Sequence, residues 1–207
     1  MSVDGETPSN LPPVVSAGAN QNLSNSATST VLSSSATDPD GTISSRLWTQ
    51  ISGPNTATFS STSVNTPTIT NLIPGLYKFR FTATDNQLAT SFAEVDVKVN
   101  RLPLITFLSP VTYSTMSGIT FSSTVSDPDG TITAVQYQSL VGPTVLSFTN
   151  PNAVTTGVGN IVEGQYRIRI TATDNNGESA SLELEITFAP PEAIMIRRNT
   201  RIKVINN

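Results

Sequence analysis

Acidic residues recur in two short phrases of the chain, and side chains of this kind bind calcium. Asp-Pro-Asp-Gly-Thr begins at residues 38 and 127, and Thr-Ala-Thr-Asp-Asn supplies a further acid in each half. Calcium takes about six to eight oxygen ligands, mostly carboxylates and carbonyls on flexible loops. If both phrases of one half lie at the same end of a domain, three carboxylates converge there. The candidate calcium ligands are Asp38, Asp40 and Asp85 in the first half, and Asp127, Asp129 and Asp174 in the second.

The same residues have a second interpretation as turn formers. Asp-Pro-Asp-Gly suits a type I turn, because Asp accepts a backbone N–H, Pro presets φ and Gly ends the turn. Asp85-Asn86 likewise suits a tight hairpin. An EF-hand is excluded, since its spaced ligands and terminal Glu are absent. Turn formation is favoured over calcium binding, and no cofactor is required.

The composition argues against an enzyme. The chain has no His and no Cys, which removes imidazole bases, thiol nucleophiles, disulfides and the usual zinc ligands. Ser and Thr are plentiful, but no Ser-x-x-Lys pair activates one of them. The acids lie mainly in turns or at outward strand positions, whereas acid–base catalysis needs a carboxyl in a cleft. We therefore expect no catalytic activity.

The two halves are copies of one unit. Both acidic phrases return 89 positions later, and Gly53-Pro54 and Tyr77 return at the same offset. A repeat without gaps indicates two tandem domains. We predict a polar N-terminal arm at 1–10, a first domain at 11–100, a second at 101–188 and a basic segment at 189–207.

The patterning predicts strands throughout. Residues 76–83 alternate, with Tyr77, Phe79 and Phe81 on one face, and a strand is expected between Leu23 and Leu32. About seven short strands per copy, with turns every 8–12 residues, are typical of an immunoglobulin-like sandwich. The predicted fold is all-β: two tandem immunoglobulin-like β-sandwiches with a short C-terminal β-segment. Trp48 and Tyr77 are expected in the core rather than in a sugar-stacking platform.

Several phrases together resemble a known family. Ala-Gly-Ala-Asn-Gln at 17–21, the first acidic turn, Trp-Thr-Gln-Ile-Ser-Gly-Pro at 48–54 and Thr-Ala-Thr-Asp-Asn at 82–86 are similar to a polycystic-kidney-disease (PKD) type domain. The similarity is greatest to the subgroup with a Trp-x-Gln-x-x-Gly-Pro strand. The second copy keeps the turn, the Gly-Pro and the last phrase, but has Tyr137 in place of Trp48. The resemblance implies a β-sandwich spacer or binding module without catalytic activity.

The last residues differ in charge from the rest of the chain. Between 190 and 207 four basic residues stand against one acid, and apolar residues flank a polar turn. An isolated hairpin is marginal in water, so it is expected to pack on the second domain or to join another protein subunit by strand addition. A solvated tail is the alternative. The docking candidates are Ile194, Ile196, Arg197, Arg198, Arg201, Ile202, Lys203 and Val204.

Nucleic acid and membrane insertion are not expected. The body of the chain is acidic, the basic tail has no aromatic residue, and no stretch approaches about 20 apolar residues. Met1 without a secretory signal favours an accessory bacteriophage virion protein, located on the virion surface and displaying its domains towards host-surface glycans. The alternative is a set of spacer or glycan-binding modules in a bacterial cell-surface or extracellular protein.

Overall fold

The computed structural model describes residues 9–189, and all regular elements in this range are strands. The chain folds into two compact units. The first runs to Leu102 and also contains the turns at 127–131 and 174–178, and the second holds the other described residues. No helix long and apolar enough to cross a membrane occurs in the part of the chain described.

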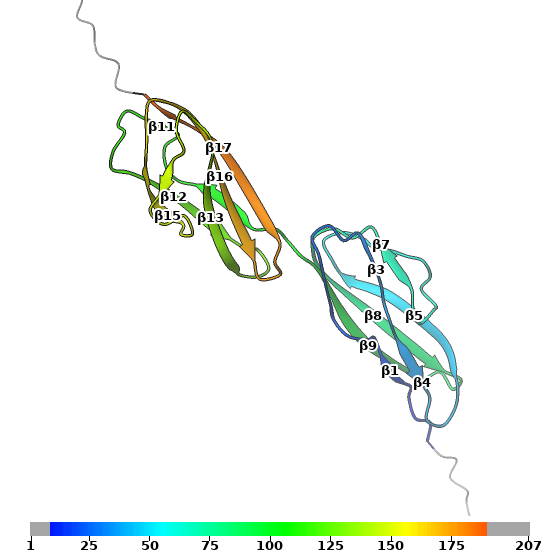
Figure 1. Cartoon of the computed structure of the whole chain (residues 1–207). Coiled ribbons are helices and arrows are strands. Elements are labelled where there is room, and N and C mark those ends of the chain that lie inside the picture. Colours follow the sequence, from blue (N-terminus) through cyan, green and yellow to red (C-terminus); the bar gives the residue numbers. More distant parts are fainter. Residues whose placement is uncertain (1–8, 190–207) are drawn as a thin grey trace, which may run out of the picture. The chain divides into compact units, whose positions relative to one another are not determined.

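The first unit is built from three antiparallel or mixed sheets (Figure 1). The largest has the order β2-β9-β8-β5, the second β3-β7-β6, and β1 pairs with β4. β8 is antiparallel to β5 and β9, whereas β2 is parallel to β9. The strands are β1 Val14–Ser16, β2 Gln21–Leu23, β3 Ser29–Val31, β4 Ser35–Thr37, β5 Ile43–Ser52, β6 Thr58–Phe59, β7 Thr68–Thr70, β8 Gly75–Asp85 and β9 Thr90–Val99.

The core of the first unit follows the alternation of its long strands. Tyr77, Phe79 and Phe81 on β8 are fully buried, as the pattern predicts. Trp48 on β5 is also buried, and its ring centroid lies 5.1 Å from that of Phe81. The outward residues of β8 are charged, and Arg80 lies 2.7 Å from Glu94 on β9. Because successive side chains of a strand point to opposite faces, one strand supplies both the core and a charged surface.

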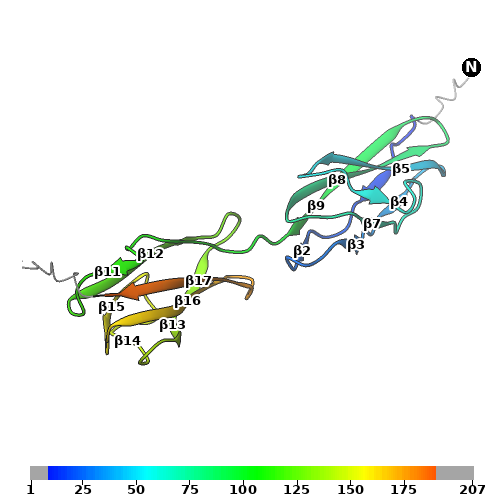
Figure 2. The same ribbon diagram turned by 90° about the horizontal axis from the view of Figure 1, so that it is seen from above.

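The second unit repeats this plan with two four-stranded sheets (Figure 2). Their orders are β10-β12-β15-β14 and β11-β17-β16-β13. β11 is parallel to β17, as β2 is to β9. The strands are β10 Leu104–Phe107, β11 Thr112–Tyr113, β12 Ile119–Ser126, β13 Ile132–Val141, β14 Ser147–Phe148, β15 Thr155–Gly159, β16 Gly164–Asp174 and β17 Ser179–Phe188.

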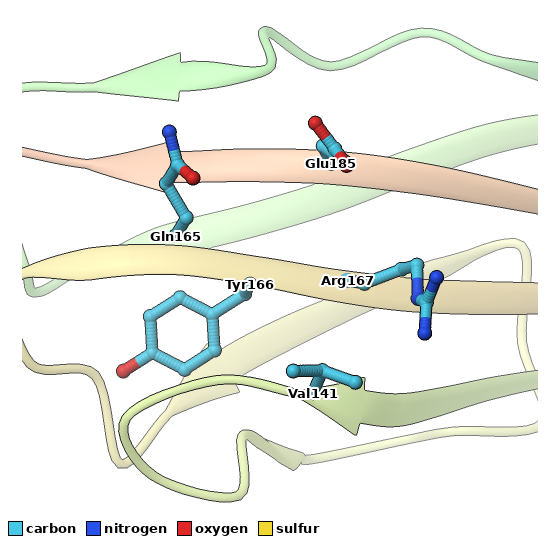
Figure 3. Close-up of a pocket in the computed structure, with 5 residues that line it drawn as sticks. All are labelled: Val141, Gln165, Tyr166, Arg167 and Glu185. Atoms are coloured by element: carbon cyan, nitrogen blue, oxygen red, sulfur yellow. The ribbon is translucent and has the colours of Figure 1, made fainter.

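Tyr137 takes the place of Trp48 in the second core. It is 2% exposed, and its hydroxyl donates to the carbonyl of Val154, as the indole of Trp48 donates to Val64. A shallow depression also lies on this sheet, lined by residues of β13, β16 and β17 (Figure 3). The prediction of two tandem all-β sandwiches is confirmed, and so is the core position of Trp48 and Tyr77.

Candidate functional site

The two acidic phrases of each copy meet at the end of a long strand. β8 ends at Asp85, and the next residue, Asn86, accepts the backbone N–H of Thr42 through Oδ1 at 2.8 Å. Asn175 accepts the N–H of Thr131 at the same distance in the second copy. The Asn that ends Thr-Ala-Thr-Asp-Asn therefore holds the turn formed by Asp-Pro-Asp-Gly-Thr. The geometry is the same in both repeats.

A buried aspartate organises the hairpin that follows each of these strands. Oδ1 of Asp85 accepts the backbone N–H groups of Gln87 and Ala89 at 2.8 and 2.9 Å. Oδ1 of Asp174 accepts those of Asn176 and Glu178 at 2.8 and 2.9 Å. Each carboxylate is at most 1% exposed, so these bonds satisfy a group that would otherwise be costly to bury. The turn interpretation of these aspartates is thus shown.

The segment leading into the first copy is held by the same acids. The side-chain amide of Asn10 donates to Oδ2 of Asp85 at 2.9 Å, and the backbone N–H of Leu11 donates to Asp40 at 3.1 Å. Sequence analysis missed Asn10. Its only signal is an Asn shortly before a Pro, a pattern too common to identify it alone.

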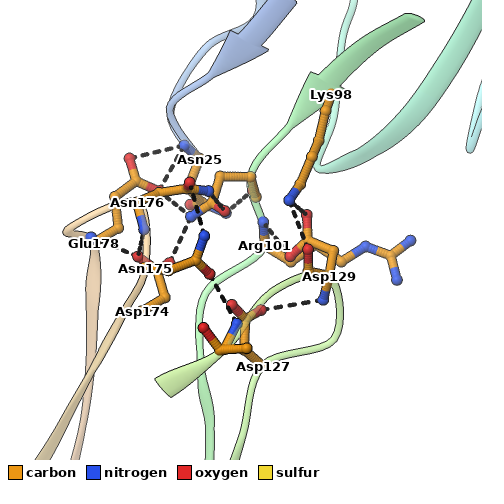
Figure 4. Close-up of polar contacts among 11 residues, drawn as sticks. Asn25, Lys98, Arg101, Asp127, Asp129, Asp174, Asn175, Asn176 and Glu178 are labelled. Carbon is orange, nitrogen blue, oxygen red and sulfur yellow. Dashed lines mark hydrogen bonds and ion pairs between the residues drawn. The ribbon is translucent and has the colours of Figure 1, made fainter. Parts of the chain in front are cut away.

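An equivalent arrangement surrounds Asp129 and Asp174, which belong to the first compact unit (Figure 4). The amide of Asn100 donates to Oδ2 of Asp174 at 2.7 Å, and the N–H of Arg101 donates to Asp129 at 3.3 Å. Lys98 also lies 3.4 Å from Oδ2 of Asp129. The predicted calcium ligands are therefore engaged by protein donors at several of their oxygen atoms.

Hydrogen bonding outweighs burial at the two structural aspartates. Burial acts to raise the pKa of Asp85 and of Asp174, but the Asn amide and the backbone N–H groups stabilise the charged form and leave each pKa below its ordinary value. Asp38 behaves in the opposite way. Burial, followed by the charges of Asp40 and Asp85, raises its pKa above the ordinary value despite a backbone hydrogen bond.

Acid is expected to destabilise the chain through the two buried aspartates. A carboxyl whose folded pKa lies below its unfolded value of about 3.9 stabilises the fold fully above that value. This stabilisation is lost as the pH falls through the folded pKa of Asp85 or Asp174. Thermal unfolding followed by circular dichroism should therefore show a melting temperature that drops as the pH falls below about 4.

Asp85→Asn is the matched control for this acid dependence. It keeps an oxygen acceptor for the turn but cannot titrate, so its melting temperature should fall less steeply in acid than that of the unaltered chain. An identical acid profile in the two proteins would contradict the assignment. Asp40→Asn, at an exposed turn position, should leave the acid dependence of Asp85 in place.

Calcium binding stays a prediction. Asp38 and Asp127 each keep one buried carboxylate oxygen without a hydrogen bond among the described residues. Within residues 9–189, however, no group of three or more acids is arranged to hold a metal ion. The docking segment also stays a prediction, because Ile194, Ile196, Arg197, Arg198, Arg201, Ile202, Lys203 and Val204 lie outside the described residues.

Comparison with known proteins assigns both copies to one kind of domain. The sequence model of the family described as "K319L-like, PKD domain" matches residues 17–99 and 111–188. The dyslexia-associated protein KIAA0319-like protein of Mus musculus is 28% identical over 190 residues, which is 87% of this chain. The chain spans 18% of that relative. The two matched regions coincide with the two repeats.

Two solved structures illustrate the likeness. The PKD domain of the KIAA 1837 protein is 30% identical, with a TM-score of 0.38, and the match covers 46% of this chain and 91% of that structure. The D00-D0 domain of intimin has a TM-score of 0.57 at 12% identity, covering 86% of this chain and 99% of that structure. The second likeness is one of fold.

Proposed function

The chain belongs to the K319L-like PKD domain family, and from this premise we propose that it is a non-catalytic structural and adhesive part of a cell-surface or extracellular protein. The finer role is that of a spacer whose exposed faces also contact glycans. Family membership supports this alternative over the bacteriophage virion interpretation, because the matching family is one of PKD domains and the relative named above is not a virion protein.

The observation that carries the structural role is the pairing of early and last strands. β2 is parallel to β9, with Gln21 opposite Val97 and Leu23 opposite Val99. β11 is parallel to β17 in the same way. In a parallel pair the start of one strand and the end of the other lie at opposite ends of the sheet. Tension along the chain then acts on all the hydrogen bonds between the two strands at the same time rather than one after another. This arrangement suits a spacer.

Antibodies raised against the purified chain test the proposed location. They are expected to label intact cells of the source organism, and an external protease should remove the label without lysing the cells. Labelling that requires permeabilised cells would overturn the proposal. Recovery of the antigen only in purified phage particles would also overturn it, in favour of the virion interpretation.

A further inference from the structure

The outward faces of the two copies carry equivalent charges that are paired differently. In the first unit Lys78 lies 2.8 Å from Asp96, and Arg80 lies 2.7 Å from Glu94. In these two neighbouring cross-strand pairs, each cation on β8 therefore lies against a carboxylate on β9. The ordinary role of such a ladder is to stabilise a solvated sheet face.

In the second unit only one of the two equivalent cross-strand pairs forms a close ion pair. Arg169 lies 2.5 Å from Oε1 of Glu183 and donates to that oxygen through both Nε and a terminal nitrogen. The guanidinium of Arg167 approaches the same carboxylate only to 3.9 Å and makes no hydrogen bond within residues 9–189. Glu185 stands opposite Arg167 in the strand register, yet its side-chain carboxylate has neither an ion pair nor a hydrogen bond in that range. The guanidinium donors of Arg167 and the carboxylate acceptor of Glu185 are thus open to solvent.

These two side chains line the depression on the second unit. Its volume is about 340 Å³, and its other lining residues are Val141, Gln165 and Tyr166. Figure 3 shows the Arg167 side chain extending towards Val141, with Gln165 and Glu185 on the side of β17. Val141 is 56% exposed and offers an apolar surface, whereas Tyr166 is 1% exposed and is held through its hydroxyl by Val162. The depression therefore combines polar groups with one apolar contact on the surface of a β-sheet.

We propose that this depression binds one ring of a neutral sugar, an inference that rests on the proposed adhesive function. A small anion is repelled by Glu185 and a small cation by Arg167, so a neutral ligand is favoured. Sugar hydroxyls both donate and accept, and they can therefore bind the guanidinium, the carboxylate and the amide of Gln165 together. The C–H face of the ring can rest on Val141. Because the depression is shallow and open, the dissociation constant is expected on the order of 1 mM.

A titration of the complete ¹⁵N-labelled chain with methyl β-glucopyranoside and methyl α-mannopyranoside tests this site. At least one glycoside should give saturable shifts confined to the backbone amides of Val141, Gln165, Arg167 and Glu185. Glu185→Gln combined with Arg167→Gln should weaken this binding at least tenfold while the remaining amide signals keep their positions. The matched control is Lys78→Gln with Asp96→Asn in the first unit, which should bind the glycoside unchanged.

Three outcomes would overturn the inference. These are the absence of shifts with both glycosides at about ten times the expected dissociation constant, shifts centred on other residues, and binding that survives the double substitution. Glucuronate and glucosamine distinguish the charge of the ligand, since a preference for either over the neutral glycosides would contradict the argument from opposed charges. If antibodies label intact cells but no glycoside binds, only this inference is overturned. If antibodies do not label intact cells, the proposed function itself is overturned.

Discussion

Trp48→Ala is expected to lower the free energy of unfolding of the first unit by about 3–5 kcal/mol. The side chain is 1% exposed and packs against Phe81, so its removal leaves a cavity in the core. The substitution also removes the indole N–H that donates to the carbonyl of Val64 at 3.1 Å. Urea unfolding followed by far-ultraviolet circular dichroism measures the effect, since the chain contains no other Trp to serve as a fluorescent probe.

The neighbouring residue of the same strand is the matched control. Leu47 points outward and is 48% exposed, so Leu47→Ala should change the free energy of unfolding by no more than about 0.5 kcal/mol. A loss below about 1 kcal/mol for Trp48→Ala would show that the core closes around the cavity. Comparable losses for both variants would show instead that the strand, rather than the buried ring, determines stability.

Tyr137 shows how the second copy tolerates the loss of this Trp. Its backbone N–H donates to the carbonyl of Pro151 at 2.7 Å, as that of Trp48 does to Thr62. Its hydroxyl reaches the carbonyl of Val154 at 3.2 Å. A smaller aromatic ring with a polar tip therefore fills the same position and keeps the same kind of hydrogen bond. The exchange changes the size of the core but not its architecture.

The faces of the long strands could be predicted because a period of two determines which side chains are buried. The alternation at 76–83 places Tyr77, Phe79 and Phe81 inside, and all three are fully buried. The number and bounds of the short strands could not be predicted in this way, because two or three residues show no clear alternation. The stretch between Leu23 and Leu32, expected to hold one strand, contains the end of β2 and all of β3. A turn closed by the N–H of Ala27 and the carbonyl of Ser24 separates them.

The positions of the two buried aspartates could be predicted from the sequence, but the side chains that bind them could not. The sequence places Asp85 and Asp174 at the ends of equivalent strands, yet the same carboxylates suit calcium or a turn. The Asn side chains that bind these carboxylates, Asn10 and Asn100, lie 75 and 74 positions away in the chain. Such a contact depends on how the strands pack, so local pattern carries almost no information about it.

Gly142→Ala is expected to destabilise the second unit by about 3 kcal/mol. A Cβ atom at this position would lie 2.1 Å from Cδ1 of Tyr166, and the equivalent atom at Gly53 would lie 2.5 Å from Cδ1 of Tyr77. The rings cannot swing aside without breaking hydrogen bonds. The hydroxyl of Tyr166 accepts the N–H of Val162 at 3.1 Å, and that of Tyr77 accepts the N–H of Ile73 at 2.9 Å. Urea unfolding of the complete chain measures the loss.

Gly118→Ala separates this clash from the ordinary effect of replacing a glycine. Gly118 has a φ of 68° but nothing within 4 Å of the added carbon, so its cost should be limited to about 1–2 kcal/mol of backbone strain. In a double-mutant cycle, Tyr166→Leu should remove most of the additional penalty of Gly142→Ala, because the ring that meets the new carbon is gone. Full additivity of the two substitutions would contradict a direct clash. The coupling would explain why Gly-Pro recurs in both copies: the glycine leaves room for the tyrosine ring.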